Sequence, residues 1–510
     1  MYKILINVEG NERRIAIIKD KTLEELSVER SDIEQIVGNV YKAKVENVVS
    51  GMQAAFVDIG LEKNGFLHQS DIIDPDVSYK EMLDDEVEHL SPGNGFKQGG
   101  KIEDMIKEGQ EILVQVVKGQ IGTKGSRLAT SISLPGRYLV LMPNSSKSGI
   151  SRKIVNREER ARLRQVLANL KIPKGMGVIV RTVGAEGEQD RFRRDLRYLI
   201  GVWRRICVKK VLSKAPACIH QELNAVFKTL RDSLVDDVDE ILVDNKEEFR
   251  KVRKFVGLIF PEMKPRVNFY RENEPIFYKY EIEPQIYKAL SRKVWLKCGG
   301  YIVIDRTEAL TTIDVNTGKH VGSKDLEDTV HKTNVEAAVE IAHQLRIRNI
   351  GGIIVIDFID MKNRRNQKAV LQKLGDFLKK DRAKTSISAI SPLGLVEMTR
   401  QRVRESWIGD MYEPCQCCSG KGVVKGTTTM SLEIRRNAKK IFSKGICKKL
   451  KIYCHPEVAS RLKGEDAKEV KLLEKQFRCT VEFLRGDSIY SFEDVIYKTD
   501  DGKKINIKKI

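Results

Sequence analysis

Three polar side chains on two apolar strands carry the clearest catalytic potential in this chain. In residues 310–316 (LTTIDVN), Asp314 and Asn316 are two residues apart, so a strand places them on one face. In residues 351–360 (GGIIVIDFID), an apolar run predicts a buried central strand, which Asp357 interrupts. A carboxylate at such a position is costly unless it is paired or bound to a metal ion.

Asp314 and Asp357, at the ends of neighbouring strands, form a candidate site for a hard cation. Oxygen ligands and a phosphate substrate favour Mg²⁺, for which Mn²⁺ can substitute. Such an ion would polarise a phosphoryl oxygen and activate water, while Asn316 orients the phosphate or a carboxylate. The alternative is structural: Asp314 ends a hairpin strand and Asp357 accepts hydrogen bonds from backbone amides. Asp360, three residues further on, is expected on the opposite face with a structural role.

Two further groups of residues suit a polyanionic ligand. Phe56 and Phe66 lie in short strands and can stack on bases, with Lys124 supplying charge for the nucleic-acid backbone. The alternative is that both rings belong to a core. Arg181 and Thr182 end the strand in residues 175–182, and a guanidinium fork beside a hydroxyl suits a terminal phosphate. Without context, this second pattern is a weak signal.

Cys415 and Cys418 form a C-x-x-C pair in residues 415–422 (CQCCSGKG). Structural zinc needs four ligands and one such knuckle supplies two. A second copy of the chain can supply the others. Completion within the chain by Cys447 and Cys454, or a plain thiol pair, is the alternative. Cys417 is an additional thiol that can compete as a ligand.

The elements that position these residues follow from apolar periodicity. Strands over 301–304, 310–315 and 353–359 alternate with helices over about 324–347 and 366–380, which predicts a mixed α/β sheet. Short strands from 38 to 67 and at 110–118 predict a small antiparallel barrel, and the acidic, glycine-containing insertion between them, near 72–105, is expected to be a mobile surface segment. Helices are also predicted over about 157–170, with Asn156 as N-cap, and about 189–212.

Composition and charge narrow the class of protein. A chain of 510 residues is longer than a single hydrophobic core usually holds, so several domains are expected. A net charge of +20 with a pI near 9.4 favours a nucleic-acid partner. No apolar stretch is long enough to span a membrane, and the start lacks a signal peptide, so a cytoplasmic location is expected. Nine scattered cysteines do not indicate a disulfide framework.

Several sequence strings together resemble the catalytic domain of the bacterial ribonuclease E/G family. They are 312–317 (TIDVNT), 334–338 (NVEAA), 344–348 (QLRIR), 351–361 (GGIIVIDFIDM) and 397–402 (EMTRQR). Residues 51–60 and 65–67 resemble the family's inserted oligonucleotide-binding barrel, and residues 432–435 and 453–458 are more similar to its ribonuclease G branch. The resemblance covers nearly the whole chain.

The resemblance implies a multidomain α/β fold in seven segments: a ribonuclease H-like unit formed by 1–36 and 214–280, an OB-fold RNA-binding barrel at 37–126, a 5′-monophosphate sensor at 127–213, a deoxyribonuclease I-like catalytic domain at 281–400, a zinc-link at 401–426 and a small C-terminal domain at 427–510. It implies that Asp314 and Asp357 bind Mg²⁺, that Asn316 assists, and that Phe56, Phe66 and Lys124 contact RNA. It further assigns the sensor to Gly136, Val140, Arg152, Arg181 and Thr182.

These features favour an endoribonuclease that hydrolyses single-stranded RNA. The resemblance implies that a 5′-monophosphate end stimulates it and that it acts on rRNA precursors and in mRNA decay. Zinc shared through Cys415 and Cys418 would give a homodimer or homotetramer, and no tail that scaffolds a degradation complex is expected. The alternative is a non-catalytic RNA-binding or ribosome-assembly factor. Such a factor has no need of acidic residues that face a polyanion. The presence of Asp314 and Asp357, together with Asn316, therefore favours the enzyme.

Overall fold

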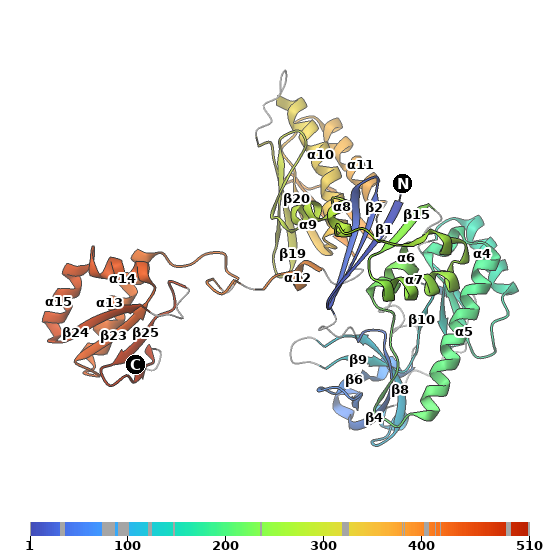
Figure 1. Cartoon of the computed structure of the whole chain (residues 1–510), viewed down its shortest axis with the longest axis horizontal. Helices are drawn as coiled ribbons and strands as arrows, with labels where there is room; N and C mark the ends of the chain where they lie inside the picture. Colours follow the sequence, from blue (N-terminus) through green and yellow to red (C-terminus); the bar gives the residue numbers. More distant parts are fainter. Residues whose placement is uncertain are drawn as a thin grey trace. The chain divides into compact units, whose positions relative to one another are not determined.

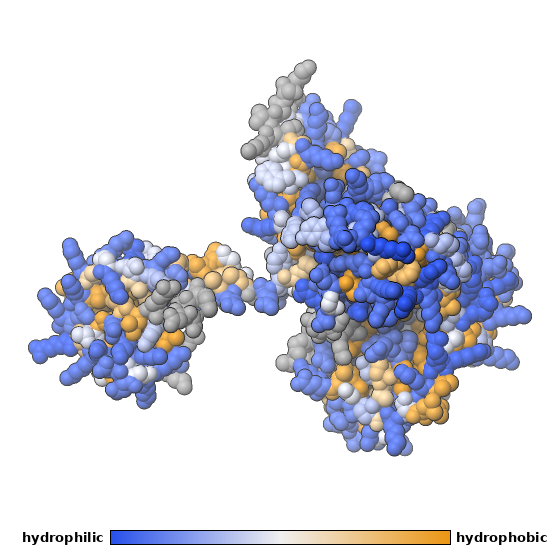
Figure 2. Space-filling view, in the orientation of Figure 1, coloured by the Kyte–Doolittle hydropathy of each residue, from blue (hydrophilic) through white to orange (hydrophobic). Residues whose placement is uncertain are grey.

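The computed structural model describes residues 2–30, 36–73, 87–89, 101–120, 125–145, 148–152, 154–234, 237–318, 326–379, 381, 383–401, 407–413, 415–418, 420–485 and 491–507. The chain divides into two compact units, residues 1–407 and 408–510. Both are covered mostly by hydrophilic side chains on the face shown in Figure 2. In the described residues, no helix is both long and apolar enough to cross a membrane.

The first sheet joins the two ends of a long insertion. Its order is β16 (Val267–Phe269), β15 (Val238–Val243), β1 (Tyr2–Glu9), β2 (Glu12–Lys19) and β3 (Thr22–Arg30). The three N-terminal strands form antiparallel hairpins, whereas β1 pairs in parallel with β15 (Figure 1). Helices α6 (Ala225–Ser233), α7 (Lys246–Ile259), α8 (Ile276–Lys279) and α9 (Ile282–Leu290) pack around this sheet.

The second sheet closes into the barrel that the short strands predict. It contains β14 (Ala217–His220), β4 (Val40–Val49), β5 (Ala54–Asp58), β6 (Gly65–His68), β9 (Arg127–Ala129) and β8 (Glu111–Lys118), and β4 pairs with both β5 and β8. The predicted antiparallel pairing is found for these strands except between β6 and β9, which pair in parallel. The prediction of a surface insertion near residues 72–105 is wrong in part. Its described strand β7 (Val87–His89) joins the next sheet, and α3 (Ile102–Met105) buries Ile102 in the barrel core because that side chain is apolar. Residues 74–86 and 90–100 lie outside the described residues.

The third sheet follows the barrel, in the order β10 (Leu134–Pro135), β11 (Leu139–Met142), β13 (Gly177–Val180), β12 (Gly149–Ser151) and β7. Its helices, α4 (Arg157–Asn169) and α5 (Gln189–Leu212), match the predicted ones. The Asn156 side chain accepts from the amides of Glu158 and Glu159 at the start of α4, as its type predicts.

The fourth sheet holds the predicted acidic residues. Its order is β17 (Lys293–Trp295), β18 (Tyr301–Arg306), β19 (Leu310–Asn316), β20 (Gly352–Asp357), β22 (Leu395–Arg400) and β21 (Thr385–Ile390), and it is mixed, as predicted. Helices α10 (Leu326–Ile347) and α11 (Arg364–Leu378) share one apolar core with one face of the sheet (Figure 1). Successive residues of β18, β19, β20 and β22 alternate between buried and more exposed, so the opposite face, here called the open face, is accessible to solvent.

The C-terminal unit has its own core. The sheet β24 (Thr480–Arg485), β23 (Lys449–Cys454), β25 (Ile496–Thr499) and β26 (Lys504–Ile505) packs against α13 (Thr427–Ser443), α14 (Pro456–Lys463) and α15 (Ala467–Phe477).

The helix α12 (Trp407–Met411) lies within residues 401–426, the predicted zinc-link. Its first residue, the buried Trp407, is the last residue of the first unit and donates from Nε1 to the carbonyl of Ile347 in that unit at 2.6 Å.

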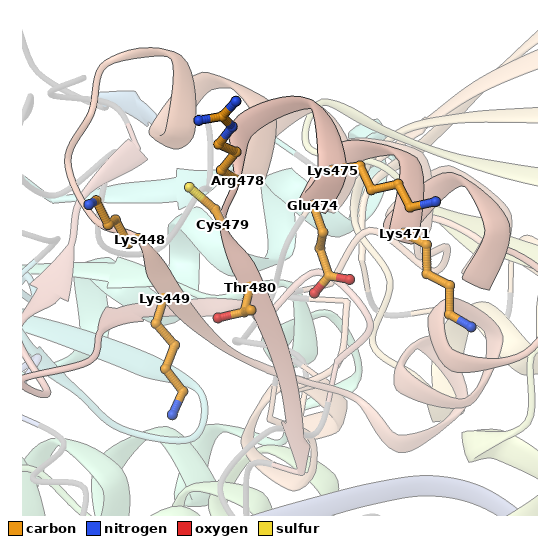
Figure 3. A pocket seen from close by; sticks show the side chains of 8 residues that line it. All are labelled: Lys448, Lys449, Lys471, Glu474, Lys475, Arg478, Cys479 and Thr480. Carbon is orange, nitrogen blue, oxygen red and sulfur yellow. The ribbon is translucent and has the colours of Figure 1, made fainter.

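A basic pocket of about 520 Å³ lies in the C-terminal unit between α15 and the neighbouring strands (Figure 3). Five cationic side chains and one carboxylate line it, and the Glu474 carboxylate accepts from the amide of Val481 at 2.8 Å. The remaining shorter elements are α1 (Gln69–Ile73) and the 3₁₀ segments Ser50–Met52, Thr182–Glu186 and Pro261–Arg266.

Candidate active site

Asp314 and Asp357 lie directly beside each other at the ends of two parallel strands. β19 and β20 are paired so that Asp314 is the register partner of Asp357. Asn316 lies on the same face of β19, and its Nδ2 donates to Oδ2 of Asp314 at 2.7 Å. The three predicted residues therefore meet on the open face, where a substrate can reach them.

The electrostatics of the acidic pair (Asp314 and Asp357) suit a cation. Partial burial raises the pKa of Asp357, and the negative charges of Asp314 and Asp360 raise it further. Like charges held side by side are relieved by a bound cation or a proton. No three His, Cys, Asp or Glu side chains gather into a metal site within the described parts of the chain. Two carboxylates fit Mg²⁺, which commonly takes its other ligands from water and substrate phosphate.

Two expectations about this strand are wrong. Asp357 does not interrupt a strand buried on both sides, because only one face of β20 is covered by helices, and Asp357 is exposed on the other. Asp360 was expected on the opposite face. However, β20 ends at Asp357, so strand alternation no longer applies, and Asp360 is exposed and acts on the pKa of Asp357.

Asn334 fixes the loop that follows Asp357. This fully buried residue of α10 donates from Nδ2 to the carbonyl of Ile359 at 2.7 Å and accepts from the amide of Ile359 at 3.1 Å. The paired hydrogen bonds hold the backbone just after the acidic pair. Sequence reasoning did not assign this role; an asparagine within an apolar helical run was the available signal.

The residues assigned to the sensor also come together. Nη1 of Arg181, just after β13, donates to the carbonyl of Gly136 at 2.6 Å and to Oδ1 of Asp232 at 2.8 Å. Burial acts to raise the pKa of Asp232, but the guanidinium groups of Arg231 and Arg181 outweigh it and hold that pKa well below its usual range. Asp232 was missed because it lies on α6, 51 residues from Arg181, and no local pattern links the two.

Strand register brings two further sensor residues together, while a third lies in the core. Parallel pairing of Ile150 with Val180 places Arg152 and Thr182 just beyond the ends of β12 and β13, where both are exposed. The hydroxyl of Thr182 lies 3.3 Å from that of Ser151. Val140 is fully buried, so it can contribute to a ligand site only through its backbone.

Comparison with known proteins identifies the family. The family model described as "Ribonuclease E/G family" matches residues 133–403, more than half of the chain. The ribonuclease G of Salmonella typhimurium (strain SL1344) is 42% identical over 486 residues, covering 94% of this chain and 97% of that protein. The chain belongs to the ribonuclease E/G family. The resemblance seen in the sequence is therefore confirmed.

Two further relatives and two domain models also match this family member. Ribonuclease G of Escherichia coli (strain K12) is 41% identical over 94% of this chain and 97% of its own length. Ribonuclease E of the same strain is 38% identical, and this chain spans 45% of that protein. An "S1 RNA binding domain" matches residues 34–131, which include the barrel, and a "RNase E/G, Thioredoxin-like domain" matches residues 414–497.

The barrel of this ribonuclease E/G family member presents aromatic rings outside its core. Phe56 and Phe66 are register partners, with ring centroids 6.0 Å apart, and His68 stacks 6.5 Å beyond Phe66. All three are half-buried, whereas the intervening residues of β5 and β6 form the barrel core. His68 was missed, although its spacing from Phe66 places both on one face. Lys124 lies outside the described residues.

The two predicted zinc ligands lie in the knuckle that the family member carries before α13. Backbone amides of Cys418 and Cys417, together with the Cys418 side chain, lower the pKa of Cys415. The sulfur of Cys418 accepts from the amide of Gly422 at 3.3 Å. By contrast, desolvation and the Cys415 sulfur raise the pKa of Cys417. Cys454 is buried in the apolar core of the C-terminal unit and Cys447 packs against that core, which does not support completion of the site within the chain.

Proposed function

We propose that this chain is an endoribonuclease that hydrolyses single-stranded RNA at the acidic pair, with Mg²⁺ as cofactor and Mn²⁺ as a substitute. The observation that carries the proposal is the pairing of Asp314 with Asp357 on the open face of the sheet. Family membership favours this function over a non-catalytic RNA-binding or ribosome-assembly factor. The six-stranded sheet would be the deoxyribonuclease I-like domain, and the sheet of β1 and β15 the ribonuclease H-like unit.

The side chains of the site suggest how the reaction proceeds. Asp314 and Asp357 would hold the cation through their carboxylates. A bound Mg²⁺ would supply polarisation of the phosphoryl group and a lowered pKa for water. Asn316, oriented by its hydrogen bond to Asp314, would donate its second amide hydrogen to a phosphate oxygen. Water would attack phosphorus and the bond to the 3′ oxygen would break. The products would be an upstream 3′-hydroxyl and a downstream 5′-phosphate.

We propose that the chain recognises RNA at two further places. Phe56 and Phe66 would stack on bases, with Lys124 binding the backbone. Gly136, Val140, Arg152, Arg181 and Thr182 would bind a 5′-monophosphate. The geometry supports this sensor because Arg181, Thr182 and Arg152 lie together at two strand ends and Asp232 orients the Arg181 guanidinium.

Arg181→Lys should reduce the preference for a 5′-monophosphate over a 5′-hydroxyl end by about tenfold, because an ammonium cannot offer a bidentate fork. The measurement compares cleavage of two otherwise identical RNA oligomers. Thr182→Val serves as a second variant that leaves the Arg181–Asp232 contact in place, and Arg204→Ala removes an exposed arginine of α5 as a matched control. If both Arg181→Lys and Thr182→Val kept the native preference for a 5′-monophosphate end, the assignment of the sensor would be contradicted.

Zinc bound by Cys415 and Cys418 would join two chains, giving a homodimer or homotetramer. Lowering of the Cys415 pKa supports this proposal because zinc binds thiolates. We further propose action on rRNA precursors and mRNA in the cytoplasm, as the family resemblance implies.

Chelation tests the proposed chemistry directly. Internal cleavage of a 5′-monophosphorylated single-stranded RNA should stop when Mg²⁺ is removed with EDTA and return when Mg²⁺ or Mn²⁺ is added in excess. Product ends are identified by their susceptibility to a phosphatase. RNA binding without any cleavage in Mg²⁺ would favour the non-catalytic alternative.

A further inference from the structure

Three residues at the edge of the catalytic sheet form a cluster that the proposed reaction does not use. Trp295 ends β17 with 51% of its surface exposed. Its ring centroid lies 5.3 Å from that of Tyr301, at an interplanar angle of 63°. The ammonium of Lys293 lies 4.2 Å from the centroid of Trp295 and 3.5 Å from that of Tyr301. We call these residues the Trp295 cluster.

The Trp295 cluster is in line with the acidic pair across the open face. Trp295 pairs with Tyr301, which pairs with Asn316. Lys293 pairs with Val303, which pairs with Asp314. β17 and β19 are separated by one strand, so the cluster lies about 10 Å from the site, given the usual spacing of ~4.8 Å between strands. An RNA strand bound at the acidic pair could therefore reach it within one or two nucleotides.

Backbone contacts hold the cluster in place. The amide of Leu296 donates to the carbonyl of Gly300 at 2.8 Å, which closes the β17–β18 turn. Glu336 of α10 accepts from the amides of Lys297 and Cys298, the latter at 3.0 Å. A turn anchored to a core helix keeps Trp295 from folding away, so its ring is preorganised for a ligand.

The chemistry of the cluster matches one nucleotide. An exposed indole stacks on any nucleobase, and an adjacent ammonium binds a phosphate oxygen. The described contacts of Lys293 are with aromatic rings and not with a carboxylate, so its charge is available. The basic pocket of the C-terminal unit also offers cations, but none of the residues lining it is aromatic.

We propose that Trp295, Tyr301 and Lys293 form a nucleotide-binding subsite beside the scissile phosphate, in which a base stacks on Trp295 and its phosphate contacts Lys293. Tyr301 supports the indole edge-on. This proposal rests on the proposed nuclease function, because the acidic pair sets the position of the strand. The subsite would fix the path of single-stranded RNA over the open face, with little base specificity, since stacking tolerates every base.

Abasic substitution tests the subsite. Single-stranded RNA oligomers carry one abasic nucleotide, moved stepwise along both sides of the cleaved bond. With the native chain, we expect KM to rise about tenfold at one position within two nucleotides of the bond, with kcat nearly unchanged. Trp295→Ala should raise KM on intact RNA by a similar factor and lose that positional sensitivity, and Trp295→Phe should restore both. Lys475→Ala, in the basic pocket, is the matched control for loss of a surface residue outside the sheet.

Native KM and an unchanged abasic profile in Trp295→Ala would overturn the subsite. A native KM together with a changed oligomeric state in Trp295→Ala would also overturn the subsite, because the exposed Trp295 ring would then serve a contact between chains. If the native chain cleaves no RNA, the proposed function fails. The subsite is then decided by fluorescence: RNA-induced tryptophan quenching that is lost in Trp295→Phe supports it, and quenching that persists overturns it.

Discussion

Asp314→Asn and Asp357→Asn should each lower kcat for RNA cleavage by roughly 10³-fold or more, because either change removes half of the charge that holds the cation. Affinity for single-stranded RNA should stay near its native value, since the neutral side chains remove repulsion toward phosphate. The measurement pairs single-turnover cleavage in saturating Mg²⁺ with a binding titration in EDTA.

Asp305→Asn is the matched control for this result. Asp305 is an acidic residue of β18 on the same open face, but it pairs with the guanidinium of Arg292, not with the acidic pair. Its replacement should leave kcat within about threefold of native. Equal losses of kcat in Asp305→Asn and Asp314→Asn would indicate that the substitutions perturb the sheet, and would contradict a specific role for the acidic pair.

Cys415→Ser and Cys418→Ser should each release nearly all bound zinc and lower the molar mass of the proposed homodimer or homotetramer, because the zinc link between chains is lost. A knuckle that supplies two of four ligands predicts about one zinc ion per two native chains. Zinc content by elemental analysis and molar mass by light scattering check the two effects on the same sample.

Cys417→Ser is the contrasting variant, because Cys417 lies between the two predicted zinc ligands. The Cys417 pKa is raised whereas the Cys415 pKa is lowered, so Cys417 is the poorer thiolate. This variant should keep native zinc content and mass. Loss of zinc in Cys417→Ser, with retention in Cys418→Ser, would reassign the ligands.

The sequence predicts local features of the site well and long-range features poorly. Strand periodicity alone places Asp314 and Asn316 on one face, and their hydrogen bond follows from that spacing. The contact between Asp314 and Asp357 depends on the register of parallel strands joined through α10, which no local pattern specifies. The order of the strands suggests that the two aspartates are neighbours, but a structural role for each is an open alternative until the family resemblance favours the shared site.

Errors arose where a local rule was extended beyond its element. The apolar run of β20 suggested burial on both faces, but apolar residues such as Ile353 remain exposed when helices cover only one face. Asp360 lies beyond the end of β20, where alternation stops. Asp232 and Asn334 were missed because each acts through a contact across distant segments. Only the tertiary structure shows such partners.

The parallel pairing of β1 with β15 has a consequence for synthesis of the chain. The N-terminal strands emerge first, yet β1 gains its second neighbour only after the barrel, the third sheet and β15 have been translated. At usual elongation rates, this delay is on the order of ten seconds or more. During that time, the edge of β1, with the apolar residues Ile4, Leu5 and Ile6, is open to wrong pairing. Chaperone protection of the nascent N-terminal hairpins would therefore matter more for this chain than for one folded from contiguous domains.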